Sequence, residues 1–180
     1  MRRETLFKIT LSAFFIALAY VLPFLTGQIP QIGSMLCPMH IPVILCGFIC
    51  GWKYGLVVGL VVPILRSLTL SMPPLFPTAT CMTFELSTYG ALSGLLYNLL
   101  PKKKINIYSS LLISMIVGRI VWGITMMICL NINGSTFTFS AFLSGSIINA
   151  LPGIILQIIL IPILIMALET IKTSNMRNQN

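Results

Sequence analysis

Long apolar runs dominate the sequence, and short polar or proline- and glycine-rich breaks separate them. The first run, from Leu6 to Leu25, is long enough to cross the hydrocarbon core of a bilayer as a helix. The other runs, interpreted in the same way, predict an all-α integral membrane protein, a bundle of six transmembrane helices in a single membrane domain, residues 1–180. The expected helices are 5–25, 37–52, 54–71, 78–100, 107–131 and 141–170.

The second and third of these helices are predicted with unusually short spans. Residues 37–71 must cross the membrane twice, and a helix rises only about 1.5 Å per residue. A single long helix would instead leave Lys53 near its middle, where the bilayer penalises a charge. The stretch Trp52-Lys53-Tyr54 combines two aromatics with a cation, a pattern that indicates a turn at headgroup depth.

The composition identifies lipid as the solvent for most of the chain. Hydrophobic residues make up 57% of the 180 residues and charged residues 8%, whereas a soluble domain carries about a quarter charged residues. The N-terminal run lacks a convincing cleavage site, so it is expected to be a retained helix. The five cysteines lack metal-ligand spacing and are expected to behave as small buried hydrophobes, which predicts neither a metal nor a cofactor.

The distribution of basic residues predicts the orientation. With six spans and a cytoplasmic N-terminus, every Lys and Arg except Arg66 and Arg119 falls on the cytoplasmic side. The expected outer segments contain no Lys or Arg: 26–36, 72–77 and 132–140. The positive-inside rule therefore predicts that both termini are cytoplasmic. The net charge of +8 is then a topology signal; it favours contact with anionic lipid and gives no reason to invoke nucleic acid.

Polar side chains at membrane depth mark the candidate site. A charge near the bilayer centre costs at least about 2.5–3.5 kcal/mol, so it usually faces a cavity or a partner. Helical spacing puts Met82, Glu85 and Tyr89 on one face of a helix, and Arg119 with Trp122 on a face of the next. The candidate substrate-binding residues are Glu85, Arg119, Asn149, Tyr89, Trp122, His40, Arg66 and Met82.

Structural roles remain open for several of these residues. Glu85 and Arg119 could form an ion pair that only joins two helices. Arg66 could snorkel or cap backbone carbonyls, and His40, between two prolines, could only tie down a loop. The sequence contains no P-loop, no paired acids and no Ser/His/Asp set, so an enzyme is not expected.

Glycines recur at every fourth position, and such stripes let helix backbones approach closely in lipid. They are Gly47, Gly51, Gly55 and Gly59, followed by Gly90 and Gly94. Their expected role is helix packing inside the bundle. Ala13 and Ala17 repeat the spacing on the first helix, where a face can remain available to a partner.

Several stretches resemble the S components of energy-coupling factor (ECF) vitamin transporters. They are the Ala13-x-x-x-Ala17 motif, the segment Pro38-Met39-His40-Ile41-Pro42, and Met72-Pro73-Pro74-Leu75-Phe76-Pro77 leading into Phe84-Glu85-Leu86. The resemblance implies a bacterial multi-pass cell-membrane protein that binds a vitamin or its precursor in its outer half. It also implies docking onto a transmembrane coupling subunit that carries two cytoplasmic ATPases, with Ala13 and Ala17 in the docking face.

The interior charges suggest candidate ligands. Arg66 and Arg119 outnumber Glu85, which favours a small carboxylate; pantothenate is the first candidate. Vitamin B6-like compounds or pyrimidine precursors would suit the rings of Tyr89 and Trp122. The alternative function is a standalone secondary transporter or channel for a small organic solute, which an internal repeat would favour; none is visible in the sequence. A purely structural membrane scaffold is a third choice, disfavoured by the buried polar side chains.

Overall fold

The computed structural model describes residues 2–26, 35–101, 103–132 and 150–177 of the chain. Its helices are α1 Arg2–Val21, α3 His40–Cys50, α4 Trp52–Leu70, α5 Thr80–Leu99, α6 Lys104–Ile132 and α8 Leu151–Arg177, with short helical turns η1 Leu22–Thr26 and η2 Leu75–Ala79. The predicted six-helix, all-α architecture is confirmed. Four of the helices, α1, α4, α6 and α8, are long and apolar enough to cross a membrane.

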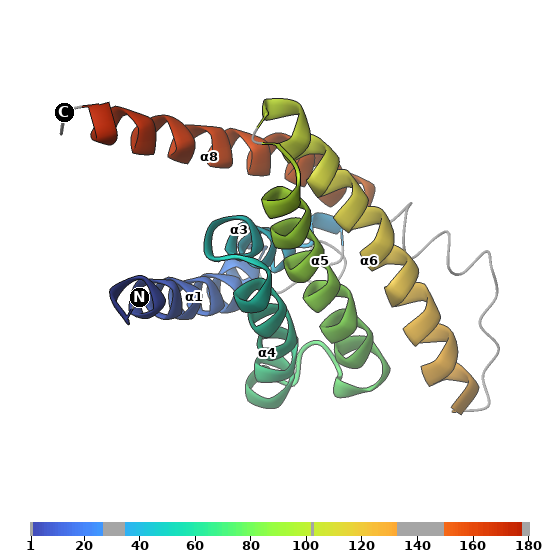
Figure 1. The fold of residues 1–180 in the computed structure, drawn as a ribbon. Coiled ribbons are helices and arrows are strands. Elements are labelled where there is room, and N and C mark those ends of the chain that lie inside the picture. Colours follow the sequence, from blue (N-terminus) through green and yellow to red (C-terminus); the bar gives the residue numbers. More distant parts are fainter. Residues whose placement is uncertain (1, 27–34, 102, 133–149, 178–180) are drawn as a thin grey trace.

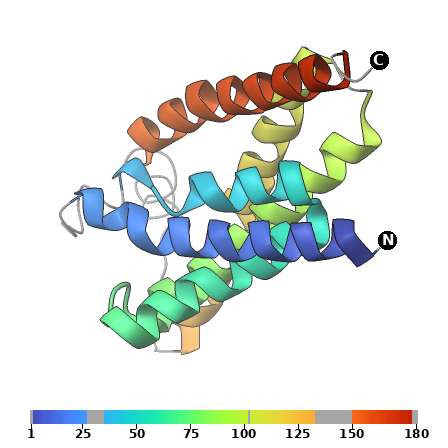
Figure 2. The same cartoon turned by 90° about the vertical axis from the view of Figure 1, so that its left-hand side faces the viewer.

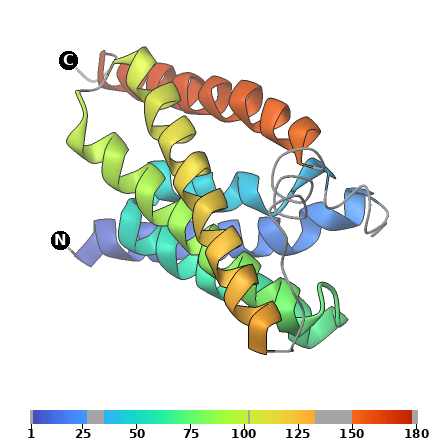
Figure 3. The ribbon, with the colours of Figure 1, turned by 90° about the vertical axis from the view of Figure 1, so that its right-hand side faces the viewer.

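The antiparallel helices α4 and α5 form the centre of the bundle (Figure 1). Helix α6 crosses α5 on one side (Figure 3), while α3 packs against α5 and α4 on the other. Helix α1 lies beside α3 (Figure 2), and α8 contacts the bundle mainly through α3 and α6. The core of the bundle therefore lies where α3, α4, α5 and α6 meet.

One side of the bundle collects four helix ends. In Figure 2 the start of α1, the α3–α4 turn, the α5–α6 turn and the end of α8 all lie at the right. Every Lys and Arg in the sequence except Arg66 and Arg119 lies near one of these four ends. The arrangement is consistent with the predicted topology, in which these four ends face the cytoplasm.

Glycines bring α4 and α5 together, as their spacing predicts. A Cβ added to Gly47 or Gly55 would collide with the backbone carbonyl of Gly90. One added to Gly59 would lie 2.5 Å from the backbone of Leu86. These contacts are too short for non-bonded atoms. Gly47 lies on α3 and Gly55 and Gly59 lie on α4, so both helices meet α5 with backbone against backbone. Such close approach is how helices gain van der Waals energy in lipid.

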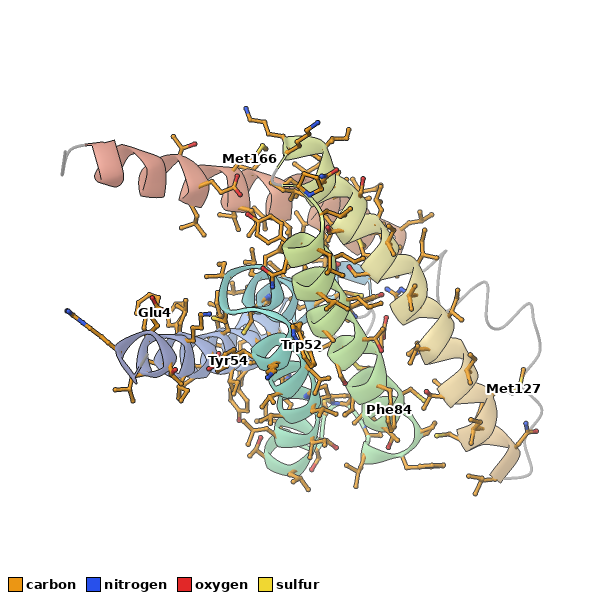
Figure 4. All side chains as sticks on the ribbon, viewed as in Figure 1. Glu4, Trp52, Tyr54, Phe84, Met127 and Met166 are labelled. Atoms are coloured by element: carbon orange, nitrogen blue, oxygen red, sulfur yellow. The ribbon has the colours of Figure 1, made fainter. Side chains whose placement is uncertain are left out.

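The turn between α3 and α4 is at Gly51, and not at Trp52-Lys53-Tyr54 as predicted. Gly51 has φ = 100°, in a region that residues with a Cβ rarely adopt. Its carbonyl accepts the N–H groups of Tyr54 and Gly55 at 3.1 Å, which starts α4 immediately. Trp52 and Tyr54 therefore lie in the first turn of α4 (Figure 4), so the aromatic and basic pattern marks the interface but misplaces the turn.

Helix α3 is shorter than predicted. It has 11 residues, about 16 Å at the usual rise, against about 30 Å of hydrocarbon. A turn closed by the His40 N–H and the Cys37 carbonyl, 3.1 Å apart, precedes it. His40, the first residue of α3, is buried.

Other helix ends differ by a few residues. Helix α6 begins at Lys104, before the predicted residue 107, and α8 continues to Arg177, past the predicted residue 170. A five-residue turn, η2, precedes α5 where a plain loop was expected. The predicted helical residues 141–149 lie outside the described part of the chain.

Cysteine labelling in intact cells tests the orientation. In a cysteine-free variant, Met72→Cys should react with a membrane-impermeant maleimide, because this exposed residue follows the predicted outer end of α4. Lys103→Cys, in the exposed α5–α6 turn, should react only after the cells are permeabilised. The opposite pattern would show that the termini are outside.

Candidate functional site: a buried ion pair between α5 and α6

Glu85 is the centre of a polar cluster in the interior. It lies five residues after the start of α5 and is 1% exposed. Its Oε1 accepts a hydrogen bond from the Tyr89 hydroxyl, one helical turn along, at 2.9 Å. The Arg119 guanidinium of α6 approaches the same oxygen at 2.9 Å through Nη1. The two helix faces predicted from spacing thus meet at this pair.

Helix α3 adds His40 to the cluster. Its Nε2 lies 3.5 Å from Glu85 Oε1, and its ring centroid lies 5.3 Å from that of Tyr89. The Tyr89 ring packs against Gly118, where an added Cβ would collide with ring carbons. Tyr89 is therefore held from both sides, and its hydroxyl fixes the position of the Glu85 carboxylate.

Three buried nitrogens in the cluster lack a hydrogen-bond partner among the described residues. They are Nε of Arg119 and both ring nitrogens of His40, of which Nε2 is 3.5 Å from Glu85 Oε1. Leaving a buried polar group unpaired costs about 1–3 kcal/mol, so such groups call for an explanation. Arg119 also reaches the Cys37 Sγ, 3.8 Å from its Nη2, a weak contact at most. The cluster therefore has hydrogen-bonding capacity that the described protein atoms leave unused.

The charges within the cluster cancel. With His40 as the neutral imidazole, Glu85 contributes −1 and Arg119 contributes +1, and no Asp, Glu, Lys or Arg other than these two makes an ion pair with either residue in the described structure. Removing one partner of such a buried pair leaves an uncompensated charge, which costs about 3–5 kcal/mol. Phe84 on α5 and Met127 on α6, labelled in Figure 4, are apolar residues about half exposed on the outside of the bundle.

Met82 and Trp122 lie next to the cluster along their helices. Met82 precedes Glu85 by three residues on α5 and packs against the hydrophobic core. Trp122 follows Arg119 by three residues on α6 and is half-buried. Both positions lie toward the predicted outer ends of their helices. Asn149, also predicted for the site, lies outside the described residues.

Arg66 belongs to a different part of the molecule. Its Nη1 donates to the backbone carbonyl of Tyr20, near the end of α1, at 2.6 Å. Its guanidinium carbon lies 5.7 Å from the ring centroid of Tyr20 and 5.6 Å from that of Phe24. The carbonyl end of α1 carries a partial negative charge, so Arg66 caps that helix, which was one of the two roles left open.

Sequence reasoning missed two contributors. Cys37 was interpreted as a small buried hydrophobe, and Gly118 was not singled out. Both carry a signal in hindsight: Cys37 is three residues before His40, and Gly118 directly precedes Arg119. The sequence neighbours of a candidate polar residue therefore contribute to the same cluster.

Comparison with known proteins decides the family. The profile of the ECF transporter substrate-specific component matches residues 7–165, most of the chain. The chain belongs to this family. It is thus a multi-pass membrane protein, a transporter subunit and not an enzyme, and family membership implies a substrate and an ECF module as partners. No curated protein and no solved structure matches this S component.

Proposed function

We propose that this S component binds a small water-soluble vitamin or vitamin precursor at the Glu85–Arg119 cluster. The observation that carries the proposal is the set of buried nitrogens without hydrogen-bond partners, among them Arg119 Nε and His40 Nδ1. They lie beside a fully buried ion pair, in a chain whose family binds substrates. The bound compound would supply the missing partners on the outer side of the bundle.

A purely structural role for the Glu85–Arg119 pair does not account for the unpartnered nitrogens beside it. An ion pair that only joined α5 and α6 would be most stable with every nitrogen satisfied, because unpaired polar groups cancel its Coulombic gain. Glycine contacts already hold α5 against α4, and Tyr89 packs against Gly118 on α6 without help from charges. Buried polar groups that are retained at such cost favour a binding role.

We further propose that α1 docks onto the coupling subunit, which carries two cytoplasmic ATPases. Ser12, Phe15 and Ala19 face α3 and α4 and are buried. Ala13 and Ala17 lie on the other face of α1 and are exposed. Small exposed residues four apart permit another helix to approach closely. In this proposal the protein resides in the cell membrane with both termini in the cytoplasm.

The structure changes the balance between the candidate ligands. Pantothenate was favoured because Arg66 and Arg119 together outnumber Glu85, but Arg66 is engaged with the end of α1. Without Arg66, and with His40 as the neutral imidazole, the cluster has no excess positive charge. Pantothenate, vitamin B6-like compounds and pyrimidine precursors all remain candidates. A standalone secondary transporter or channel is the competing function, tested in the Discussion.

Substitutions at the ion pair test the binding site. Glu85→Gln and Arg119→Met should each weaken vitamin binding about tenfold or more, which is about 1.4 kcal/mol. Isothermal titration or tryptophan quenching of purified protein across a vitamin panel provides the measurement. The matched control is Glu169→Gln, because Glu169 also accepts a tyrosine hydroxyl, that of Tyr97, but lies at the inner end of α8. Unchanged affinity together with a collapse of thermal stability would show that the ion pair is only structural.

A further inference from the structure

We propose that the ligand group bound at the Glu85–Arg119 cluster is uncharged: a carbonyl, hydroxyl or ring nitrogen, and not a carboxylate or phosphate. The inference rests on the proposed function and narrows its substrate class. It follows from three features: the position of every charged residue in the chain, the engagement of Arg66, and the donors left open in the cluster.

The sequence limits which charges can reach the site. The chain has 11 basic residues, three acidic residues and one histidine. Outside the cluster, Arg66 is the only charged residue between the end of α1 and the start of α8 that lies outside the predicted cytoplasmic segments. Segments 27–34 and 133–149 contain no Asp, Glu, Lys, Arg or His. Whatever their conformation, they cannot contribute a charged side chain to balance a charged ligand.

Arg66 is not available as that balancing charge. It is 4% exposed, donates to the Tyr20 carbonyl and lies against two aromatic rings. Turning it toward another anion would leave the end of α1 without its cap and the Tyr20 carbonyl without this donor. With His40 as the neutral imidazole, the cation that can meet a ligand at the cluster is therefore Arg119.

Arg119 is already neutralised by Glu85. An anionic ligand would place a second negative charge beside a fully buried carboxylate, with one guanidinium for both. Like charges at such separations disfavour ionisation of both groups, and a net charge in a low-dielectric interior is poorly solvated. A neutral ligand adds no such imbalance, so the cluster discriminates against anions.

The nitrogens without hydrogen-bond partners define what a neutral ligand must present. Arg119 Nε can only donate, so the ligand needs an acceptor there. His40 Nδ1 can donate or accept, depending on its tautomer. A carbonyl or ring nitrogen next to a second polar atom would satisfy both, as occurs in amides and nitrogen heterocycles. The half-buried Met82 and Trp122 are suitably placed along α5 and α6 for its apolar part.

Matched pairs of acid and neutral compounds test the inference on the full-length protein in nanodiscs. The pairs are nicotinate with nicotinamide, pantothenate with pantothenol, and orotate with uracil. In any pair that binds, the neutral member should bind about tenfold tighter or more. Tighter binding of the acid would overturn this inference while supporting the proposed function. Binding of none of these compounds, nor of any other vitamin in the panel, would contradict both.

A charge substitution provides the second arm. Glu85→Gln leaves Arg119 uncompensated, so the preference should shift toward the acid by about tenfold or more within a pair. Glu169→Gln, the control at the inner end of α8, should leave the ratio unchanged. An unchanged ratio in folded Glu85→Gln would overturn the inference, because charge would then not govern selection. If Glu85→Gln does not fold, the wild-type comparison decides by itself.

Discussion

Gly90→Val is expected to unfold the bundle or prevent its assembly in the membrane. A Cβ at this position would collide with the backbone carbonyl and Cα of Gly55, neither of which can move without shifting a whole helix. Overpacking usually costs about 1–3 kcal/mol, and a collision with backbone belongs at or above the upper end of that range. Folded proteins are stable by only about 5–15 kcal/mol in total. The yield of monodisperse protein and its thermal transition in detergent measure the effect.

The same substitution at an exposed position provides the control. Ala167 lies on α8 and is exposed, so Ala167→Val adds methyl groups without a collision in the described structure. It should leave the thermal transition nearly unchanged. Gly90→Ala should already destabilise the protein measurably. If Gly90→Val had normal yield and stability, α4 and α5 would not be in backbone contact, and the central packing described above would be wrong.

The glycine contacts were predictable because their cause is local. Spacing of four residues places small side chains on one helix face, and in lipid such a face favours close packing against another helix. The α3–α4 turn was not predictable in the same way. Trp52-Lys53-Tyr54 reports depth in the membrane, while the turn depends on the positive φ of Gly51. In the sequence, Gly51 belongs to the same four-residue series as the packing glycines, so its role in the turn was not apparent.

The candidate site was predictable in part for a similar reason. Glu85 and Arg119 stand out because a charge in lipid is costly wherever its helix points. Which charges meet is a tertiary property, and depth alone could not separate Arg66 from the cluster. Arg66 faces the end of α1, whose carbonyl makes the hydrogen bond. The contribution of His40 depends on α3 packing against α5, a tertiary contact that hydropathy does not predict.

Ala17→Trp is expected to abolish uptake in cells while leaving ligand affinity within about threefold, under about 1 kcal/mol. Ala17 is exposed on α1, and the buried face of that helix is formed by other residues, including Phe15 and Ala19. An indole ring there would hold a docking helix away, since close approach requires small side chains. The ligand cluster lies on α3, α5 and α6, and should bind as before. Uptake of radiolabelled vitamin and titration of the purified variant measure the two effects separately.

Ile128→Trp is the matched control, because Ile128 is 55% exposed on α6 and outside the proposed docking face. It should retain uptake, which would show that a tryptophan facing lipid is tolerated. Loss of binding together with uptake in Ala17→Trp would mean that α1 packs internally and that the docking proposal fails. Wild-type protein alone in liposomes separates the two transport functions. Sustained concentrative uptake there, without an ATPase, would identify a standalone transporter, whereas an S component depends on its partners to move the ligand it holds.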